Sequence, residues 1–292
     1  MRRLIAAACG LALLVAGCGP PRPDHPVIGA KNFTEQVVLG ELLAQEIEAK
    51  SGLKVERRFY LAGSYICQQA LVSGRIDGYV EYTGTALTAI LKQPVDRDAD
   101  RVLKTVRDLY ASRYNVVAAQ PLGFENTFAM VIRGEDAGAL HLTTLSQAAR
   151  IAPQWRLGVG YEFEQRPDGL PGLSAAYGLK FAAAPRTMDL GLLYRALGAH
   201  QVDMIAANST DGPIEALGLV ALEDDRHYFP PYQAVPLVRA EALKRWPQMQ
   251  TALDALAGRI TAEDMRAMNE AVDGAHRDPA EVVREFRVRK GL

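Results

Sequence analysis

The stretch Asp77-Gly78-Tyr79-Val80-Glu81-Tyr82-Thr83-Gly84-Thr85 follows a run of residues typical of a helix and combines tyrosines, threonines, acids and glycines. A turn of this composition can present an aromatic ring and a hydroxyl group side by side. Such a pair suits a small ligand with a cationic, methylated head. The alternative is a purely structural turn, in which a strand ends and Thr83 or Thr85 starts the next helix. The rest of the chain bears on this choice.

On both sides of this stretch, short apolar strands alternate with helical segments. This order predicts an α/β fold with mostly parallel central strands, arranged as two similar lobes with a ligand between them. Asn32 or Thr34 is expected to cap the first helix, Gly52 to end it, and Gly74 to close the second. Strands are expected at 27–29, 53–60, 76–80, 127–132, 156–160 and 202–207, and helices at 35–50, 67–73, 146–151, 190–198 and 212–217.

The chain from Ala240 onward departs from this alternation and is predicted to be a helical tail. Helices are expected at 240–246, 248–257 and 262–273, with a last helix from Pro279 to about Lys290. Thr261, followed three residues later by Asp264, forms a plausible capping pair for the third of them.

The N-terminus reads as a targeting segment. Arg2 and Arg3 precede an apolar run of 12 residues, Leu4 to Val15, which is too short to span a bilayer as a stable helix. Residues 1–17 are therefore predicted to be a signal peptide. Small residues before Cys18 resemble a bacterial lipobox, which predicts lipidation of Cys18 and a proline-rich tether over 18–26. The alternative is an ordinary secretory signal cut near Ala16 or Gly17.

Composition excludes several classes of function. The chain has 33 basic and 34 acidic residues, so removing Arg2 and Arg3 leaves 31 − 34 = −3, which does not favour nucleic acid. Cys67 is the one cysteine left after Cys9 and Cys18, and it is expected to be a buried apolar residue. The five histidines show no metal-ligand spacing, and no nucleophile elbow, phosphate loop or Cys-x-x-C motif occurs. We expect no metal, no cofactor and no membrane-spanning stretch after the signal peptide.

Six sequence blocks, in order, resemble the substrate-binding proteins of osmoprotectant (glycine betaine, choline, carnitine) ABC importers. The blocks are Ile28-Gly29-Ala30-Lys31-Asn32-Phe33-Thr34-Glu35-Gln36, Glu81-Tyr82-Thr83-Gly84-Thr85, Glu125-Asn126-Thr127-Phe128-Ala129, Glu162-Phe163 with Arg166 and Asp168-Gly169, Ser209-Thr210-Asp211-Gly212, and Asp224-Asp225 with Phe229-Pro230-Pro231-Tyr232. The resemblance implies a two-lobed periplasmic-binding-protein fold of type II, with two crossovers and hinge closure on the ligand. It places lobe 1 at 27–125 and 231–292 and lobe 2 at 126–230.

The resemblance also implies a binding site. Tyr82, Phe128 and Tyr232 match three walls of the family's aromatic box, whereas Asn208 stands where the family has a fourth, tyrosine wall. Thr85 matches a position that offers a hydroxyl to the ligand. Lys31 and Arg166 match bases that hold the ligand carboxylate in some members.

The chemistry of these residue types fits such a ligand. A quaternary ammonium has no N–H donor, so ring faces must recognise it, at about 0.5–2 kcal/mol per contact. A planar guanidinium matches a carboxylate. Because Asn208 opens one side of the box, two kinds of ligand are expected equally: a bulky betaine such as ergothioneine, or the smaller glycine betaine or choline. Glu162 could accept a hydrogen bond from a ring N–H of such a ligand.

Structural alternatives exist for each of these residues. Phe128 could be a core residue and Tyr232 a half-buried hinge aromatic. Lys31 and Arg166 could be solvated surface charges, and Asn208 could cap a helix entering at Asp211. In addition, Glu162 and Glu164 could form an acid–base pair, although two acids at this spacing on a loop are common.

The sequence therefore predicts a lipid-anchored, monomeric, extracytoplasmic binding protein that delivers its ligand to a permease driven by an ATPase. An enzyme built on the same scaffold would need a paired nucleophile and base, which the sequence does not offer. A sensory lipoprotein that binds without transport stays open, because it would use the same cleft.

Overall fold

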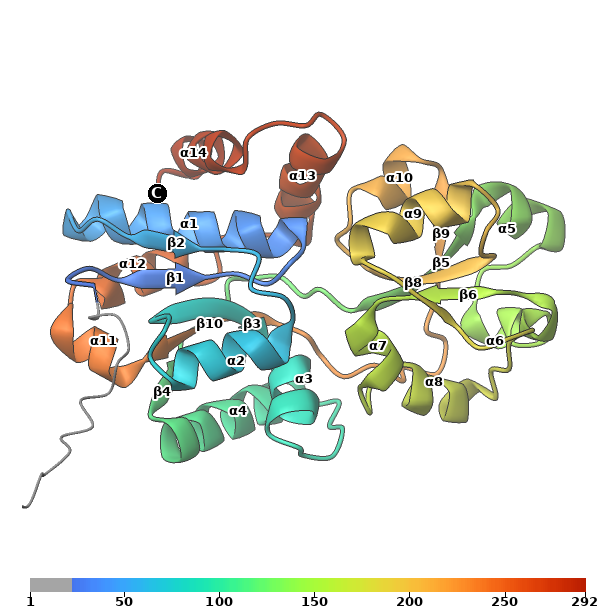
Figure 1. Cartoon of the computed structure of the whole chain (residues 1–292), viewed down its shortest axis with the longest axis horizontal. Coiled ribbons are helices and arrows are strands. Elements are labelled where there is room, and N and C mark those ends of the chain that lie inside the picture. The colour runs from blue at the N-terminus through green and yellow to red at the C-terminus, as the bar shows by residue number, and fades with distance from the viewer. Residues whose placement is uncertain (1–22) are drawn as a thin grey trace, which may run out of the picture.

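The computed structural model describes residues 23–292, which form two lobes side by side, each built on one five-stranded sheet (Figure 1). The strand order is β2-β1-β3-β10-β4 in lobe 1 and β7-β6-β8-β5-β9 in lobe 2. The predicted two-lobed α/β fold is confirmed. The strands of lobe 1 are β1 (Val27–Gly29), β2 (Glu56–Arg58), β3 (Gly78–Tyr82), β4 (Val116–Ala118) and β10 (Ala234–Arg239); those of lobe 2 are β5 (Phe128–Arg133), β6 (Leu157–Val159), β7 (Arg186–Thr187), β8 (Met204–Asn208) and β9 (Leu219–Leu222).

Each sheet contains one strand that runs against the others. In lobe 1 this strand is β10, which pairs antiparallel with β3 and β4, and in lobe 2 it is β5, which pairs antiparallel with β8 and β9. The chain reaches β5 directly from lobe 1 and reaches β10 directly from lobe 2, so it crosses between the lobes twice. The two crossing segments touch through an antiparallel bridge between Glu125 and Gln233. The exact domain boundaries stay a prediction.

Helix α1 (Thr34–Ser51) is the central helix of lobe 1. Its apolar side carries Val38, Leu42 and Ile47 into a core shared with the C-terminal helices. The predicted C-terminal helices are confirmed, and in Figure 1 they pack back onto lobe 1. They are α11 (Ala240–Arg245), α12 (Met249–Leu256), α13 (Ala262–Asp273) and α14 (Pro279–Lys290).

The remaining helices of lobe 1 lie between its strands along the chain. They are α2 (Ser64–Val72), the short α3 (Thr83–Thr85), a π-helical turn (Ala86–Ile90) and α4 (Ala99–Tyr114). Those of lobe 2 are α5 (Gly134–Leu140), α6 (Leu145–Ala148), a 3₁₀ turn (Ala152–Gln154), α7 (Tyr161–Gln165), α8 (Leu170–Tyr177), α9 (Leu190–Gly198) and α10 (Pro213–Ala216).

Two predicted features of helix α1 have different outcomes. Gly52 ends the helix as expected, with φ of 68° in the left-handed region that glycine tolerates. The predicted N-cap is wrong. Phe33 occupies the cap position without a side-chain hydrogen bond, and the Thr34 hydroxyl donates instead to Asp273 of α13 at 2.5 Å.

Several other boundaries differ from the prediction. Helix α2 starts at Ser64, three residues earlier than expected, and the strand expected at 53–60 shortens to Glu56–Arg58. Strand β3 extends to Tyr82, so Thr83 starts α3 as the structural alternative proposed.

The predicted signal peptide (1–17) and lipidation site Cys18 lie outside the described residues. Within residues 23–292, no helix is long and apolar enough to cross a membrane, and no group of His, Cys, Asp and Glu could hold a metal ion. Cys67 is fully buried, as predicted, and burial raises the pKa of its thiol to about 12.

Candidate functional site

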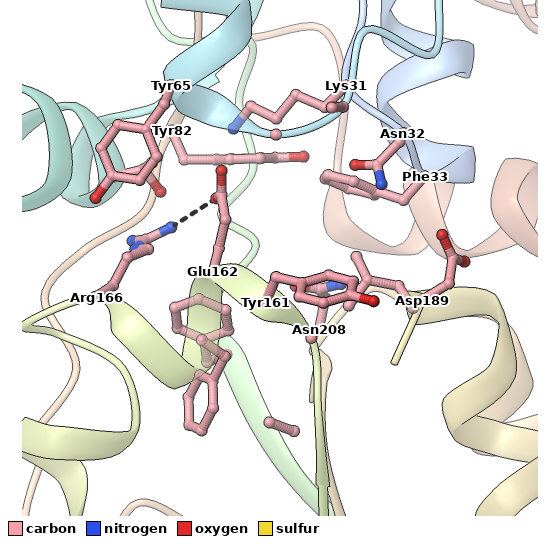
Figure 2. Close-up of a pocket in the computed structure, with 18 of the residues that line it drawn as sticks. Lys31, Asn32, Phe33, Tyr65, Tyr82, Tyr161, Glu162, Arg166, Asp189 and Asn208 are labelled. Carbon is pink, nitrogen blue, oxygen red and sulfur yellow. Dashed lines mark ion pairs between the residues drawn. The ribbon is translucent and has the colours of Figure 1, made fainter. Parts of the chain in front are cut away.

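A cavity of about 420 Å³ lies between the lobes, at the ends of strands from both sheets (Figure 2). Its volume lies within the range of about 300–1,000 Å³ that is common for small-molecule sites. In Figure 2, Lys31, Tyr65 and Tyr82 of lobe 1 lie on one side, and Glu162, Arg166 and Asn208 of lobe 2 on the other. All eight predicted site residues line this cavity: Lys31, Tyr82, Thr85, Phe128, Glu162, Arg166, Asn208 and Tyr232. Their roles as ligand contacts stay a prediction.

Tyr82 is the last residue of β3, and its side chain has a different partner at each end. The hydroxyl donates a 2.5 Å hydrogen bond to Glu35 of α1. The Lys31 ammonium lies 5.0 Å from the ring centroid on one face, while the other face borders the cavity (Figure 2). Burial, followed by the Glu35 carboxylate, raises the pKa of Tyr82 well above its usual value, so the hydroxyl remains a donor.

Lys31 is buried and forms an ion pair with Glu81, which removes the alternative of a solvated surface charge. The Glu81 carboxylate also accepts a 3.2 Å hydrogen bond from the Tyr79 hydroxyl. An ammonium group has three donors. Because the contact with Glu81 uses one of them, the Lys31 ammonium keeps donor capacity for a further partner.

Arg166 is also buried, and its guanidinium is held by Asp168. Its Nε and Nη2 donate to the two Asp168 oxygens at 3.0 and 2.5 Å, and the Tyr232 hydroxyl donates to Asp168 at 2.6 Å. Burial opposes both charges, yet the ion pair outweighs it, so the pKa of Arg166 is raised and that of Asp168 lowered. The third nitrogen, Nη1, lies 3.7 Å from Glu162 and is the donor still turned toward the cavity (Figure 2).

Phe128 lines the cavity and lies at the centre of an aromatic cluster. Its ring centroid is 4.8 Å from that of Phe163, 5.9 Å from Phe229 and 5.8 Å from Tyr232. The Arg166 guanidinium carbon lies 4.9 Å from the same ring centroid. Phe128 is half-buried and packs against the cores of both lobes. It is therefore a core residue and also lines the cavity.

Asn208 ends β8 and lies opposite Phe128 in the sheet register. Its backbone N–H donates to Asp211 at 3.0 Å, and helix α10 begins only at Pro213, so Asn208 does not cap it. Tyr194 donates to Asp211 at 2.7 Å. Burial is the main cause that raises the pKa of Asp211 to about 7.

Glu162 bridges the lobes. Its carboxylate accepts hydrogen bonds from the backbone N–H of Ser64, at the start of α2, and from the Ser64 hydroxyl at 3.0 Å. Glu164 lies apart from the cavity lining and accepts from Thr187 at 2.7 Å. The two acids therefore have separate partners, which contradicts an acid–base pair.

Sequence reasoning missed several rings of the cavity wall, namely Phe33, Tyr65, Tyr161 and Phe163. Tyr161 is 64% exposed, and in Figure 2 its ring lies across the cavity from Tyr82. Phe33 and Phe163 stand inside sequence blocks that carry the family resemblance, which was the available signal. Tyr65 and Tyr161 carried none, because the folding of the two lobes brings them to the same cavity.

Comparisons with known proteins identify a family of transport proteins. The family described as "Substrate binding domain of ABC-type glycine betaine transport system" matches residues 26–288. A carnitine transport binding protein of Listeria monocytogenes is 32% identical over 285 residues, covering 97% of this chain and 91% of that protein.

Two further matches add other ligand names. An ergothioneine transport permease/ergothioneine binding protein of Helicobacter pylori is 33% identical over 267 residues, covering 91% of this chain and 48% of that protein. A crystal structure of a glycine betaine/carnitine/choline ABC transporter superposes with a TM-score of 0.75 at 31% identity, covering 90% of this chain and 98% of that one.

Proposed function

Because this chain belongs to the family of substrate-binding domains of ABC-type glycine betaine transport systems, we propose that it captures a trimethylammonium carboxylate between its lobes for import. One observation carries the proposal: aromatic rings and two buried bases line the same cavity between the lobes. This pairing matches the two poles of a betaine, whose cation has no hydrogen-bond donor and whose anion needs several.

The trimethylammonium group is assigned to the ring side of the cavity. Tyr82, Phe128 and Tyr232 provide ring surface, and the Thr85 hydroxyl lies in the same lining. Tyr161 lines the cavity from lobe 2 and offers a ring to the side that Asn208 leaves without one. Acids that hold the two bases also reduce the positive charge of the site, which favours entry of a cationic head.

The carboxylate is assigned to Lys31 and Arg166. Each base is oriented by a buried acid, Glu81 or Asp168, each retains N–H donors beyond that contact, and both residues line the cavity. Side chains fixed in this way lose little conformational entropy when the ligand binds, which is the advantage of a preorganised site.

The solute is proposed to be a betaine larger than glycine betaine. Asn208 is smaller than a tyrosine and adds a donor and an acceptor, so it leaves polar space beside the rings. Relatives named for carnitine and ergothioneine offer precedents for a larger solute. Glu162 lines the cavity and can accept from a polar side group of such a solute.

Calorimetric titration with glycine betaine, choline, carnitine and ergothioneine tests the proposal. We expect saturable binding with a stoichiometry of one for at least one of the carboxylate-bearing solutes, and tighter binding of carnitine or ergothioneine than of glycine betaine. Absence of heat from all four would refute the proposal. Choline as the tightest ligand would refute the assignment of the carboxylate to the two bases.

The proposal includes anchoring through a lipid on Cys18 and partnership with a permease and an ATPase. Expression of the full chain in a bacterium, followed by fractionation, tests the anchor. Wild-type protein should stay with membranes, and Cys18→Ala should release it. An equal membrane fraction for both proteins would contradict lipidation at Cys18.

A further inference from the structure

Glu35 of α1 is fully buried, outside the ligand cavity, and receives hydrogen bonds from four separate segments of the chain. Its carboxylate accepts from the Tyr82 hydroxyl at 2.5 Å, the Asn126 amide at 2.8 Å, the Thr210 hydroxyl at 2.5 Å and the Asn269 amide at 3.1 Å. A carboxylate offers about four acceptor sites, so these donors saturate it. Burial raises the pKa of Glu35, and the four hydrogen bonds oppose that rise by favouring the ionised form. Among the described residues, no cation forms an ion pair with Glu35.

The four donors come from lobe 1, from a segment that crosses between the lobes, and from lobe 2. Tyr82 ends β3 of lobe 1, Asn269 belongs to α13, and Asn126 lies on the crossing segment that leads into β5. Thr210 alone lies in lobe 2, in the loop after β8. The hydrogen bond between Thr210 and Glu35 therefore joins the lobes.

The loop that carries Thr210 fits closely against α13. The Asn269 amide donates to the Thr210 carbonyl oxygen at 2.9 Å. A side-chain carbon placed on Gly212 would lie 2.8 Å from the Glu270 Cα, which leaves no room for one. The loop 208–212 thus docks onto lobe 1 through Glu35 and α13 together, and in Figure 1 α13 lies on the side of lobe 1 that faces lobe 2.

We infer that Glu35 is a latch that couples closure of the lobes to the wall of the ligand cavity. In the structure it accepts from Thr210 of lobe 2, and through the Tyr82 hydroxyl it fixes the ring that borders the cavity. Glu35 does not line the cavity and acts as a positioning residue. The inference rests on the proposed function for its ligand-binding readout.

The latch should raise the free energy of separating the lobes. When the lobes separate, the Glu35 carboxylate loses one of its donors, and a buried carboxylate is costly when its hydrogen bonds are incomplete. Opening is therefore disfavoured while Thr210 can donate. Removing the Thr210 hydroxyl should lower the closed population, and the apparent affinity should fall with that population.

Three variants test the latch. Thr210→Val removes the hydroxyl group and keeps the shape of the side chain. Thr210→Ser keeps the hydroxyl group and removes the methyl group. Thr34→Val is the matched control, because Thr34 is adjacent to Glu35 but donates to Asp273 within lobe 1. The readouts are the calorimetric affinity and stopped-flow dissociation rate of the solute, among the four above, that binds most tightly. Hydrogen exchange of residues 208–212 in the ligand-free protein is the third readout.

We expect Thr210→Val to dissociate its ligand about tenfold faster and to exchange faster over 208–212, with Thr210→Ser and Thr34→Val close to wild type. Wild-type dissociation and exchange in Thr210→Val would overturn the latch. An equal loss in Thr34→Val, or no rescue by Thr210→Ser, would also overturn it. If no solute binds the wild type, faster exchange confined to Thr210→Val supports the latch while the proposed function fails.

Discussion

At the scale of single residues, Tyr82 has the central position because its ring and its hydroxyl have separate tasks. The ring borders the cavity, and the hydroxyl donates to Glu35, which also holds lobe 2. Removing the ring and removing the hydroxyl should therefore have effects of different size.

Tyr82→Ala should abolish detectable binding, because it removes a ring wall of the cavity and one donor to Glu35. Tyr82→Phe keeps the ring and should bind about tenfold more weakly, since a hydrogen bond to a charged group contributes about 1.5–3 kcal/mol. Calorimetry with the same solute measures both variants. Wild-type affinity in Tyr82→Ala would show that the cation lies elsewhere.

Asn208→Tyr restores a ring where the resemblance implies a fourth wall. We expect tighter binding of glycine betaine and weaker binding of larger betaines, because the new ring adds a cation–π contact and fills the space beside the cage. Competitive titrations with glycine betaine and ergothioneine measure the change in preference. An unchanged ratio of affinities would mean that position 208 does not select the ligand.

Asp211 predicts a pH dependence of stability. Burial raises its pKa from 3.8 to about 7, so the folded protein favours the neutral carboxyl. The contribution of Asp211 to stability is then complete below about pH 4 and is lost as the pH rises through 7. Relative to Asp211→Asn, the wild type should lose about 2–4 kcal/mol of unfolding free energy between pH 4 and 8.

Urea unfolding of both proteins at several pH values checks this dependence on Asp211. The difference between wild type and Asp211→Asn should shrink or change sign as the pH rises. A difference that stays constant from pH 4 to 8 would contradict the raised pKa.

At the scale of elements, the N-terminus of α2 meets lobe 2 through Glu162. Gly63 precedes the helix, and a side-chain carbon there would lie 2.1 Å from a Glu162 carboxylate oxygen. The negative carboxylate is well placed at a helix N-terminus, where unpaired N–H groups and the helix dipole favour it.

Gly63→Ala should therefore displace Glu162 and weaken ligand binding about tenfold, with little change in the melting temperature, because its φ of −91° suits any residue. Gly138→Ala is the control, since it adds a side chain within helix α5 where no atom lies within 4 Å. Equal affinities for the two variants would argue against a role for the contact between α2 and Glu162.

The same elements show where sequence reasoning succeeds and where it fails. Helix α13 begins where predicted because Thr261 and Asp264 form a capping box from residues close in the chain. Helix α2 starts earlier than predicted because its first N–H is satisfied by Glu162, 98 residues away. Likewise, Thr34 does not act as a cap because its hydroxyl donates to Asp273, 239 residues away.

The candidate site follows the same rule. Seven of the eight predicted residues lie in the sequence blocks and Asn208 directly precedes one, so the resemblance could bring them together. Neither Tyr161, which reaches the cavity from lobe 2, nor the network around Glu35 has a local signal, because both depend on how the two lobes meet. Contacts within one segment were predictable, and contacts between the lobes were not.

At the scale of the whole molecule, two crossing segments join the lobes, and the proposed function places the ligand between them. The cavity, the contact between Glu162 and Ser64, and the hydrogen bond between Glu35 and Thr210 all lie between the lobes. Ligand binding should therefore be coupled to the equilibrium between open and closed lobes. A solute that fits the cage should shift this equilibrium toward the closed form.

In the proposed function, ring faces recognise the positive charge of a trimethylammonium group. This recognition is measured by calorimetric comparison of the tightest-binding betaine with its neutral isostere, in which a tert-butyl group replaces trimethylammonium. The two solutes share shape and carboxylate, so we expect at least about tenfold weaker binding of the isostere, a difference of about 1.4 kcal/mol. Equal affinity of the two solutes would contradict it.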